Sequence, residues 1–286
     1  IMFIILLLFA IKVFAEPRFG AEFTFTNSTI VKDQPDRFLT NSSKSEIYRD
    51  LLVKRILSIC KGCTSEIIEN KYYLPTPKIN YPDGFYFVVD TDPGVIEVQT
   101  RPQTVREIKK NVDRLQTDLF DAAAEINLFP HLHHGGGHIH MSAEGSVDNN
   151  ILLMRNLIVD FVNHPGLSTG ILERDFLNAP PLTQLHPENL EAFRRVIEDV
   201  NNKKIRSPRV LAERINTDVY TWNQYSIERP DKFQALNLIR IAEEDPPDRT
   251  FEFRAIRAQK TAGEFLILTR MLEGRLAFLK RQTAPI

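Results

Sequence analysis

Four segments of the chain alternate apolar and polar residues with the two-residue period of a β-strand. They are GAEFTFT, GVIEVQT, GHIHMS and TFEFRAI, which begin at Gly20, Gly94, Gly137 and Thr250. In each segment one side is apolar, and the other bears carboxylate, imidazole, amide or guanidinium groups. The chain is therefore expected to build a sheet with one apolar face for a helical layer and one polar face.

Helical periodicity occupies the intervals between these strands. The clearest helix begins at Thr104, where Thr104 and Glu107 form a capping box, and its apolar positions continue to Ala122. We also expect a strand over residues 85–90 and further helices over residues 147–163, 187–200, 208–215, 230–241 and 261–280. The last of these helices begins with a second capping box, Thr261 with Glu264. The uneven intervals favour an α+β fold, with helices on one face of the sheet, over a regular doubly wound sheet.

The polar strand faces carry a candidate metal site. If the strands share one sheet, their polar groups converge in one cleft, and oxygen donors outnumber nitrogen donors there. Such a donor set suits Mg²⁺ or Mn²⁺ better than a closed zinc site. The candidate ligands are Glu22, Asp90, Glu97, His138 and Glu252. The alternative is an ordinary solvated sheet face, because exposed sheets also alternate apolar and polar residues.

Two further features are expected in the same cleft. Arg254 follows Glu252 by two residues, so its guanidinium would point into the cleft and neutralise an anionic substrate or a phosphoryl group. Gly135, Gly136 and Gly137 precede the strand that carries His138. Their lack of side chains would let backbone amides approach a bound anion closely.

The histidines upstream of the glycines allow another interpretation. His131, His133 and His134 lie within the tract PHLHHGGGHIHMS, and histidine-rich runs bind transition metals without catalysis. A separate surface site for zinc or copper is therefore an alternative use of this tract.

The charge balance excludes some classes of partner. The chain carries 36 Lys and Arg residues against 37 Asp and Glu residues, so its formal net charge is -1. The net charge is too small to create an electrostatic field that attracts nucleic acid or an anionic membrane surface. We therefore expect no nucleic-acid partner, and local sites have to carry the function.

The N-terminal segment predicts export. Met2–Ile11 is an apolar run that is too short to span a bilayer but has the length of a signal-peptide core. Val13 and Ala15 occupy the small-residue positions that signal peptidase reads, which predicts a signal peptide over residues 1–15. Its n-region is atypical, because the positive charge follows the apolar run. We expect an exported, single-domain protein over residues 16–286 with no stable membrane span; a buried N-terminal strand or helix is the alternative.

The only two cysteines, Cys60 and Cys63, form a lone Cys-x-x-Cys motif. A zinc site of the usual kind needs a second pair, and no βαβ setting for a thioredoxin-type site is evident. A local structural disulfide or a pair of free thiols is the favoured interpretation.

Four motifs in order resemble the glutamine synthetase superfamily of carboxylate–amine ligases, most closely its divergent amidoligase branch. The motifs are FGAEFTF, DTDPGVIEVQT, GGGHIHMS and FEFRAIRA, and they span Phe19 to Ala258. The resemblance implies a glutamine synthetase-like catalytic domain with a concave antiparallel sheet. It also implies that the nucleotide enters at one end of the cleft, that the carboxylate substrate enters at the other, and that divalent ions lie between them.

The resemblance assigns the metal ligands to two sets. Glu22, His138 and Glu252 would hold the ion that grips the transferring γ-phosphate of ATP. Asp90 and Glu97 would hold the ion that faces the carboxylate substrate. The implied cofactors are therefore Mg²⁺ or Mn²⁺ together with ATP.

The resemblance also assigns catalytic and nucleotide-binding groups. His140 would lie near the nucleotide phosphates or the substrate, and Arg254 would stabilise the phosphoryl group, beside the amides of Gly135, Gly136 and Gly137. The implied reaction runs through an acyl phosphate: a small-molecule or peptide carboxylate attacks ATP, and an amine then displaces phosphate to leave an amide. This is phosphoryl transfer, catalysed by positioning and charge neutralisation.

Thr24 is the clearest departure from the family pattern. In the family the first strand carries two glutamates as E-x-E, and Thr24 takes the place of the second. A threonine hydroxyl contributes no charge, so the substrate-side ion should bind more weakly. This departure and the predicted export motivate an alternative function: a degenerate exported protein on the same scaffold that binds metal and a carboxylate or peptide ligand, or hydrolyses it, without ATP.

Overall fold

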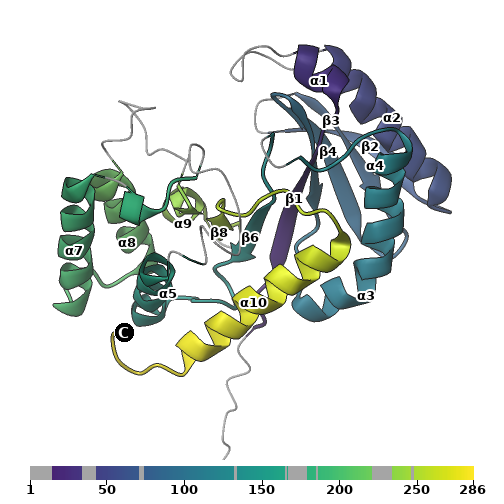
Figure 1. Ribbon diagram of the computed structural model, residues 1–286. Coiled ribbons are helices and arrows are strands. Elements are labelled where there is room, and N and C mark those ends of the chain that lie inside the picture. Colours follow the sequence, from purple (N-terminus) through teal and green to yellow (C-terminus); the bar gives the residue numbers. More distant parts are fainter. Residues whose placement is uncertain are drawn as a thin grey trace, which may run out of the picture.

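The computed structural model describes residues 15–33, 43–70, 74–131, 134–164, 166, 179–184, 186–220, 234–245 and 248–286. Its centre is an eight-stranded sheet with the order β2-β3-β4-β5-β1-β6-β8-β7, and every neighbouring pair is antiparallel (Figure 1). The strands are β1 (Phe19–Phe25), β2 (Thr64–Glu69), β3 (Pro75–Asn80), β4 (Tyr86–Asp92), β5 (Val95–Thr100), β6 (His138–Ser142), β7 (Leu236–Asn237) and β8 (Thr250–Phe253). The α+β class is confirmed.

Helices of three kinds accompany the sheet. The α-helices are α1 (Ser28–Asp33), α2 (Ser43–Ile59), α3 (Val105–Leu115), α4 (Ala122–Glu125), α5 (Ile151–Asn163), α7 (Pro187–Asn201), α8 (Pro208–Arg214), α9 (Ile239–Glu243) and α10 (Ala262–Lys280). The π-helical segments are η1 (Gln116–Asp121) and η3 (Ile215–Val219), and η2 (Leu182–Gln184) is a 3₁₀ turn. Among the helices of the described ranges, none is both long enough and apolar enough to cross a bilayer. The predicted signal peptide lies outside the described residues, apart from Ala15.

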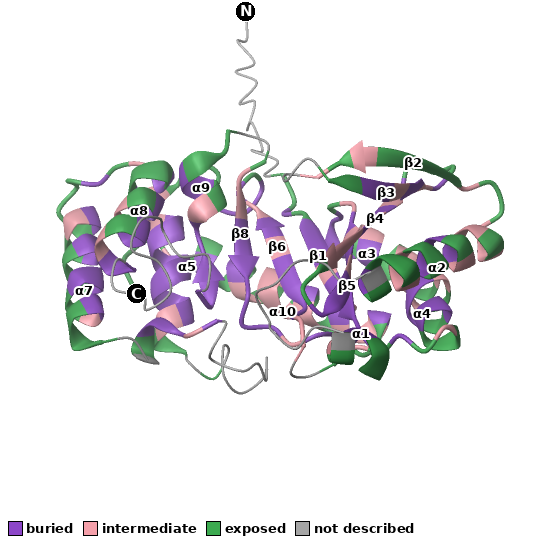
Figure 2. Ribbon diagram, turned by 90° about the horizontal axis from the view of Figure 1, so that it is seen from above, coloured by how far each residue is buried: buried purple, intermediate pink, exposed green. Residues whose placement is uncertain are grey.

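The apolar face of the sheet packs against a helical layer. Phe23 of β1 makes edge-on contacts with Phe120 of η1 and Phe265 of α10, at ring centroid distances of 5.1 and 5.3 Å. Phe161 of α5 meets Phe253 of β8 in the same way at 5.7 Å. Each buried phenylalanine contributes roughly 1.5–3 kcal/mol through removal of apolar surface from water. The central strands are buried, while the outer sides of the helices are exposed (Figure 2).

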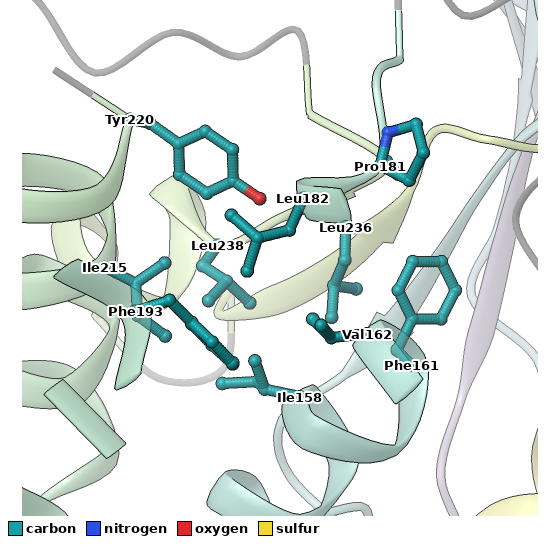
Figure 3. A pocket seen from close by; sticks show the side chains of 11 residues that line it. Ile158, Phe161, Val162, Pro181, Leu182, Phe193, Ile215, Tyr220, Leu236 and Leu238 are labelled. Atoms are coloured by element: carbon teal, nitrogen blue, oxygen red, sulfur yellow. The ribbon is translucent and has the colours of Figure 1, made fainter. Parts of the chain in front are cut away.

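The helices α5 and α7 and the strand β7 surround a second, smaller apolar region. Its lining side chains include Ile158, Phe193, Leu236 and Tyr220, which leave a cavity of only about 20 Å³ (Figure 3). Burial raises the pKa of the Tyr220 phenol well above its ordinary value. Such close packing is typical of a protein core.

The caps of the long helices account for where they begin. At α3 the predicted capping box is present, since the Glu107 amide donates to Thr104 Oγ1 at 3.3 Å and the Thr104 amide donates to Glu107 Oε2 at 2.8 Å. At α10 only half of the second predicted box forms. The Glu264 amide donates to Thr261 Oγ1, whereas the Glu264 carboxylate accepts from the amide of Lys260.

Two predicted helix boundaries were wrong. The helix expected from residue 147 begins only at Ile151, because the Asn150 side chain accepts a hydrogen bond from the Leu153 amide and caps the helix there. The prediction of one helix over residues 230–241 is also wrong for the residues that the structure describes, 234–241. Leu236 and Asn237 form β7, and the short α9 starts at Ile239, whose amide donates to the Asn237 side chain. Residues 230–233 lie outside the described ranges.

The hairpin of β2 and β3 was not predicted. Pro75 and Pro77 lie in β3 opposite Glu69 and Ile67 of the edge strand β2. Prolines weaken a strand signal because they cannot donate to the ladder, and β2 is exposed along most of its length without a clear alternation. Pairing with β4 on the inner side of β3 defines this hairpin instead.

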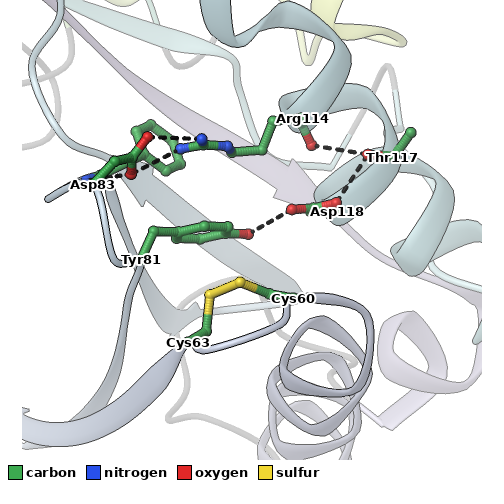
Figure 4. The surroundings of a disulfide bond; sticks show 8 residues. Cys60, Cys63, Tyr81, Asp83, Arg114, Thr117 and Asp118 are labelled. Carbon is green, nitrogen blue, oxygen red and sulfur yellow. Dashed lines mark hydrogen bonds and ion pairs between the residues drawn. A yellow bond between two sulfur atoms is a disulfide. The ribbon is translucent and has the colours of Figure 1, made fainter.

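A disulfide joins Cys60 and Cys63 at the turn between α2 and β2, so of the two interpretations left open by the sequence the structure has the disulfide (Figure 4). Nearby, the Tyr81 hydroxyl donates to Asp118 at 3.0 Å, and Arg114 pairs with Asp83 at 2.7 Å. Burial, together with the charge of Asp118, raises the pKa of Tyr81 well above its ordinary value. These contacts tie the segment before β4 to α3 and η1.

Candidate metal centre on the polar face of the sheet

Strand register brings most of the expected site residues together. Glu22 of β1 lies directly opposite His138 of β6 on one side and Gln99 of β5 on the other. His140 lies opposite Glu252 of β8, and Asn237 of β7 lies opposite Glu252 from the other side. Directly opposed residues of antiparallel strands share a face of the sheet. The polar groups of these five strands therefore meet on the face opposite the helical layer.

The centre of this arrangement is the Glu22 carboxylate. Its Oε1 lies 2.9 Å from Nε2 of His140, and its Oε2 lies 2.8 Å from Nδ1 of His138. Nδ1 of His138 is also 3.4 Å from Oε1 of Glu252. One carboxylate thus orients two imidazoles that project from alternate positions of one strand.

Three of these side chains form a group of metal-ligand geometry. One ligand atom each from Glu22, His140 and Glu252 comes within 4.8 Å of the other two. Ligands on opposite sides of a divalent ion are separated by roughly 4–5 Å, twice the usual bond length. The donor set, two carboxylates and one imidazole, suits a hard or borderline divalent cation. His140 joins this set directly, whereas His138 lies beside it against both carboxylates.

Glu252 is held by neighbours on both sides of its carboxylate. Arg254 donates to Oε1, and the Asn237 side-chain amide donates to Oε2 at 2.7 Å. Glu252 and Arg254 are both buried. Arg254 was expected to face a phosphoryl group, and in this structure its guanidinium contacts the Glu252 carboxylate. Residues that donate hydrogen bonds to a ligating carboxylate, as Arg254 and Asn237 do to Glu252, form the usual second layer of a metal site.

The protonation states of the Glu22 and Glu252 carboxyl groups favour cation binding. Burial opposes ionisation of Glu22, but the charge of His140 and hydrogen bonds from both imidazoles outweigh it, so the carboxyl pKa lies well below its ordinary value. Burial likewise opposes ionisation of Glu252, yet Arg254 and the two histidines keep its pKa below the ordinary value. Burial, reinforced by Arg254, lowers the pKa of His138 to about 4. Ionised carboxylates are the forms that bind metal.

Asp90 and Glu97 lie in the neighbouring row of the same face. Asp90 is opposite Glu97, and Glu97 is opposite Thr24. Gln99 donates to Glu97 and Asn70 donates to Asp90, each at 2.9 Å. Burial and the charge of Glu22 raise the pKa of Glu97 well above its ordinary value. Within the described residues these two acids do not belong to the three-ligand group.

The glycines pack tightly against the site. Thr24 Oγ1 donates to the carbonyl of Gly136 at 2.9 Å. At Gly135, where φ is +75°, a Cβ would come within 2.5 Å of Thr24 Oγ1. A Cβ at Gly137 would come within 2.1 Å of the Gln259 side chain. The Gly137 amide donates to the carbonyl of Ile256 at 3.0 Å, so this amide is already used within the protein. Close contact of the loop with β1 and with the segment that follows β8 is thus one physical reason for these glycines.

A cleft of about 650 Å³ opens beside Glu22 and His140 on the polar face. Gln99, Tyr86 and Thr250 line it from the sheet, and the exposed Arg240 lines it from α9. Arg18, also at the cleft, pairs with Glu107 at 3.3 Å. The cleft is large enough for a small-molecule ligand. The Arg240 guanidinium adds a positive group to a lining that includes Glu22.

Three residues of the site were not predicted from the sequence. Asn237 contacts Glu252, Thr250 Oγ1 lies 3.2 Å from Nδ1 of His140, and Arg240 lines the cleft. The two-residue strand β7 is too short to show alternation, so only its register with β8 identifies Asn237. In the histidine tract, His131 and His134 have ring centroids 4.8 Å apart, and His133 lies outside the described residues.

The chain matches no protein-family model and no characterised protein sequence. Its function has to be inferred from the residues of this site.

Proposed function

We propose that the chain is a metal- and ATP-dependent carboxylate–amine ligase with a glutamine synthetase-like fold of the amidoligase type. The observation that carries this proposal is the group of Glu22, His140 and Glu252, which lies on the polar face of an antiparallel sheet and beside an open cleft. All four sequence motifs that resemble the family contribute strands to this one sheet. The Mg²⁺ or Mn²⁺ ion would be held by these three side chains.

A bound divalent ion would supply charge neutralisation for a transferring phosphoryl group. The protein's own residues prepare the site for it. Arg254 and Asn237 hold the Glu252 carboxylate, and Glu22 fixes the orientation of both imidazoles. Arg240 offers a positive group at the cleft, where an anionic substrate group would bind. Such positioning is the main contribution of an enzyme to phosphoryl transfer.

The proposed reaction has two steps. A substrate carboxylate oxygen attacks the γ-phosphorus of ATP, which forms an acyl phosphate and releases ADP. An amine nitrogen then attacks the acyl carbon, loses a proton and expels phosphate, which leaves an amide. Asp90 and Glu97, in the row next to Glu22, would lie on the side of the carboxylate substrate. The pKa of the Glu97 carboxyl is raised, and a second cation beside it would favour the ionised form.

Calorimetric titration with ATP tests this proposal. The purified chain should bind ATP only when Mg²⁺ or Mn²⁺ is present, and Glu22→Gln should lose this binding. Glu66→Gln is the matched control, because Glu66 lies on the same face at the exposed edge of the sheet. Absence of metal-dependent ATP binding to the unmodified chain would contradict the proposal.

Thr24 favours a second candidate function. Its hydroxyl donates to the Gly136 carbonyl, so the position of the family's second glutamate offers no negative charge, and its neutral oxygen is held against the glycine loop. We propose as the alternative a metal-binding protein on the same scaffold that takes a carboxylate or peptide ligand without ATP. Metal binding that is unaffected by ATP in the same titration supports this alternative over the ligase.

A further inference from the structure

A second cavity, of about 300 Å³, lies on the opposite side of the sheet from the metal centre. It lies between the apolar faces of β6 and β8 and the helices α5 and α10, and it is partly open to solvent, because Gly274 and Phe278 in its wall are exposed. Most of its wall is aliphatic, aromatic or thioether: Met141, Leu157, Phe161, Phe253, Met271 and Leu272.

This partly open pocket is much larger than the voids of a protein core. Interiors are close-packed, with few voids larger than a water molecule, and the apolar cavity beside Phe193 in the same protein measures only about 20 Å³. An apolar cavity of about 150 Å³ already binds benzene, and ligand pockets start at roughly 300 Å³. The space between α5 and α10 is therefore in the range of a small-molecule site.

Gly274 of α10 lies at the open side of this pocket. It lines the pocket and is itself exposed, and a Cβ at this position would meet no atom within 4 Å. Sterics therefore do not require glycine here, and glycine lowers helix stability relative to alanine. A larger side chain at this position has room to reach over the pocket.

One side of the cavity carries a charged pair. Asp160 on α5 is 2% exposed and accepts from Nε of Arg275 on α10 at 2.6 Å, while Nη2 of Arg275 donates to the other carboxylate oxygen. The Arg275 side chain is 35% exposed, and its Nη1 makes no hydrogen bond with any described residue. Nη1 can therefore donate to an anionic group at the cavity while Asp160 keeps its partner.

We propose that this cavity binds a small amphiphile with an apolar body of about ten carbons and an anionic head group, the chemistry of a medium-chain fatty acid. The body lies among Leu157, Phe161 and Met271, and the head group pairs with Arg275. Met141 and Phe253, in the wall of the cavity, lie on the strands that carry His140 and Glu252 on their other face. The site is separate from the cleft of the proposed ligase.

Calorimetric titration of the full chain with decanoate and with decanol tests the proposal. Decanoate should bind, and about tenfold more tightly than decanol, because only the carboxylate pairs with Arg275. Gly274→Leu should weaken decanoate binding by at least about tenfold while the melting temperature does not fall, since leucine fills the cavity and favours helix. Gly263→Ala, near the start of the same helix, should leave binding unchanged.

Leu157→Phe narrows the cavity from α5 and should give the same loss, which guards against a folding defect specific to α10. The proposal is overturned if decanoate does not bind, if decanol binds as tightly, or if both cavity-filling variants bind decanoate like the unmodified chain.

Discussion

Oε1 of Glu22 lies 2.9 Å from Nε2 of His140, although 118 positions separate the two residues in the chain. The second oxygen of the same carboxylate contacts His138 at 2.8 Å. Because β1 and β6 are adjacent strands of one sheet, backbone pairing fixes this relationship before any ligand binds. Backbone pairing therefore preorganises Glu22 and His140, two of the three side chains that could hold a metal ion.

Acid should destabilise the fold through His138. The pKa of His138 is lowered from 6.5 to about 4 in the folded chain, mainly by burial. The unfolded chain therefore binds the proton more tightly, and the free energy of unfolding decreases as pH falls through this window. Urea denaturation at about pH 7 and about pH 4.5 should show a loss of roughly 2–3 kcal/mol from this group.

His138→Gln should have a shallower pH dependence over this range, and the exposed His186→Gln should keep the full dependence. Glu22 and Glu252 have lowered pKa values, so the stability they contribute is lost only at lower pH. Equal slopes for His138→Gln and the unmodified chain would count against neutral burial of this imidazole.

A glutamate at position 24 should harm the fold. Thr24 is 5% exposed and lies against Gly135 and Gly136. A longer, charged side chain has to displace this loop and would stand opposite Glu97. We expect Thr24→Glu to lower the free energy of unfolding by roughly 1–3 kcal/mol, measured by urea denaturation.

Thr24→Val, which keeps the shape and removes only one hydrogen bond, should cost about 1 kcal/mol. A Thr24→Glu variant as stable as the unmodified chain, with a higher affinity for Mn²⁺, would instead mean that the loop yields and a vacant ligand position is filled.

Gly137→Ala should be strongly unfavourable. Its Cβ would lie 2.1 Å from the Gln259 side chain and 2.3 Å from the carbonyl oxygen of Arg257, so the backbone after β8 has to move. Thermal denaturation should show a clear drop in melting temperature, equivalent to roughly 1–3 kcal/mol. Gly274→Ala, where the space is open, should raise stability by up to about 1 kcal/mol. Similar melting temperatures for the two variants would refute the close packing of the glycine loop.

Removal of the disulfide should be mild and local. Cys60 and Cys63 close a very short loop at the end of α2, so the chain-entropy effect is about 2 kcal/mol. Cys60→Ala combined with Cys63→Ala should lower the free energy of unfolding by about that amount and leave Mn²⁺ affinity unchanged. A large loss of metal affinity in this double variant would show that the disulfide and the metal centre are coupled.

The strands that carry the site were predictable because their alternation is strong. β5, β6 and β8 lie within the segments expected from the two-residue period, and β1 begins one residue before its segment. The polar faces of these strands converge as expected. Local patterns also placed α3, α7 and α10 within a residue or so, because capping residues or an initial proline mark where each begins.

Other parts of the site depend on contacts that no local pattern reveals. Asn237 reaches Glu252 only because β7 pairs with β8, and its neighbours read as a helix in the sequence. The pairing of Arg254 with Glu252, and of Thr24 with Gly136, also arises from tertiary geometry. The sequence had suggested a phosphate-binding role for Arg254 and weak metal binding at Thr24.

The most direct test of the metal centre is titration of the chain with Mn²⁺, followed by calorimetry or by loss of the free-ion electron paramagnetic resonance signal. We predict one tight site whose affinity falls by at least roughly tenfold in Glu22→Gln, His140→Ala and Glu252→Gln, since each variant removes one ligand. Glu66→Gln, an exposed acid on the same face, should bind like the unmodified chain. Failure of the unmodified chain to bind Mn²⁺, or unchanged affinity in Glu22→Gln, would contradict a metal centre on this face of the sheet.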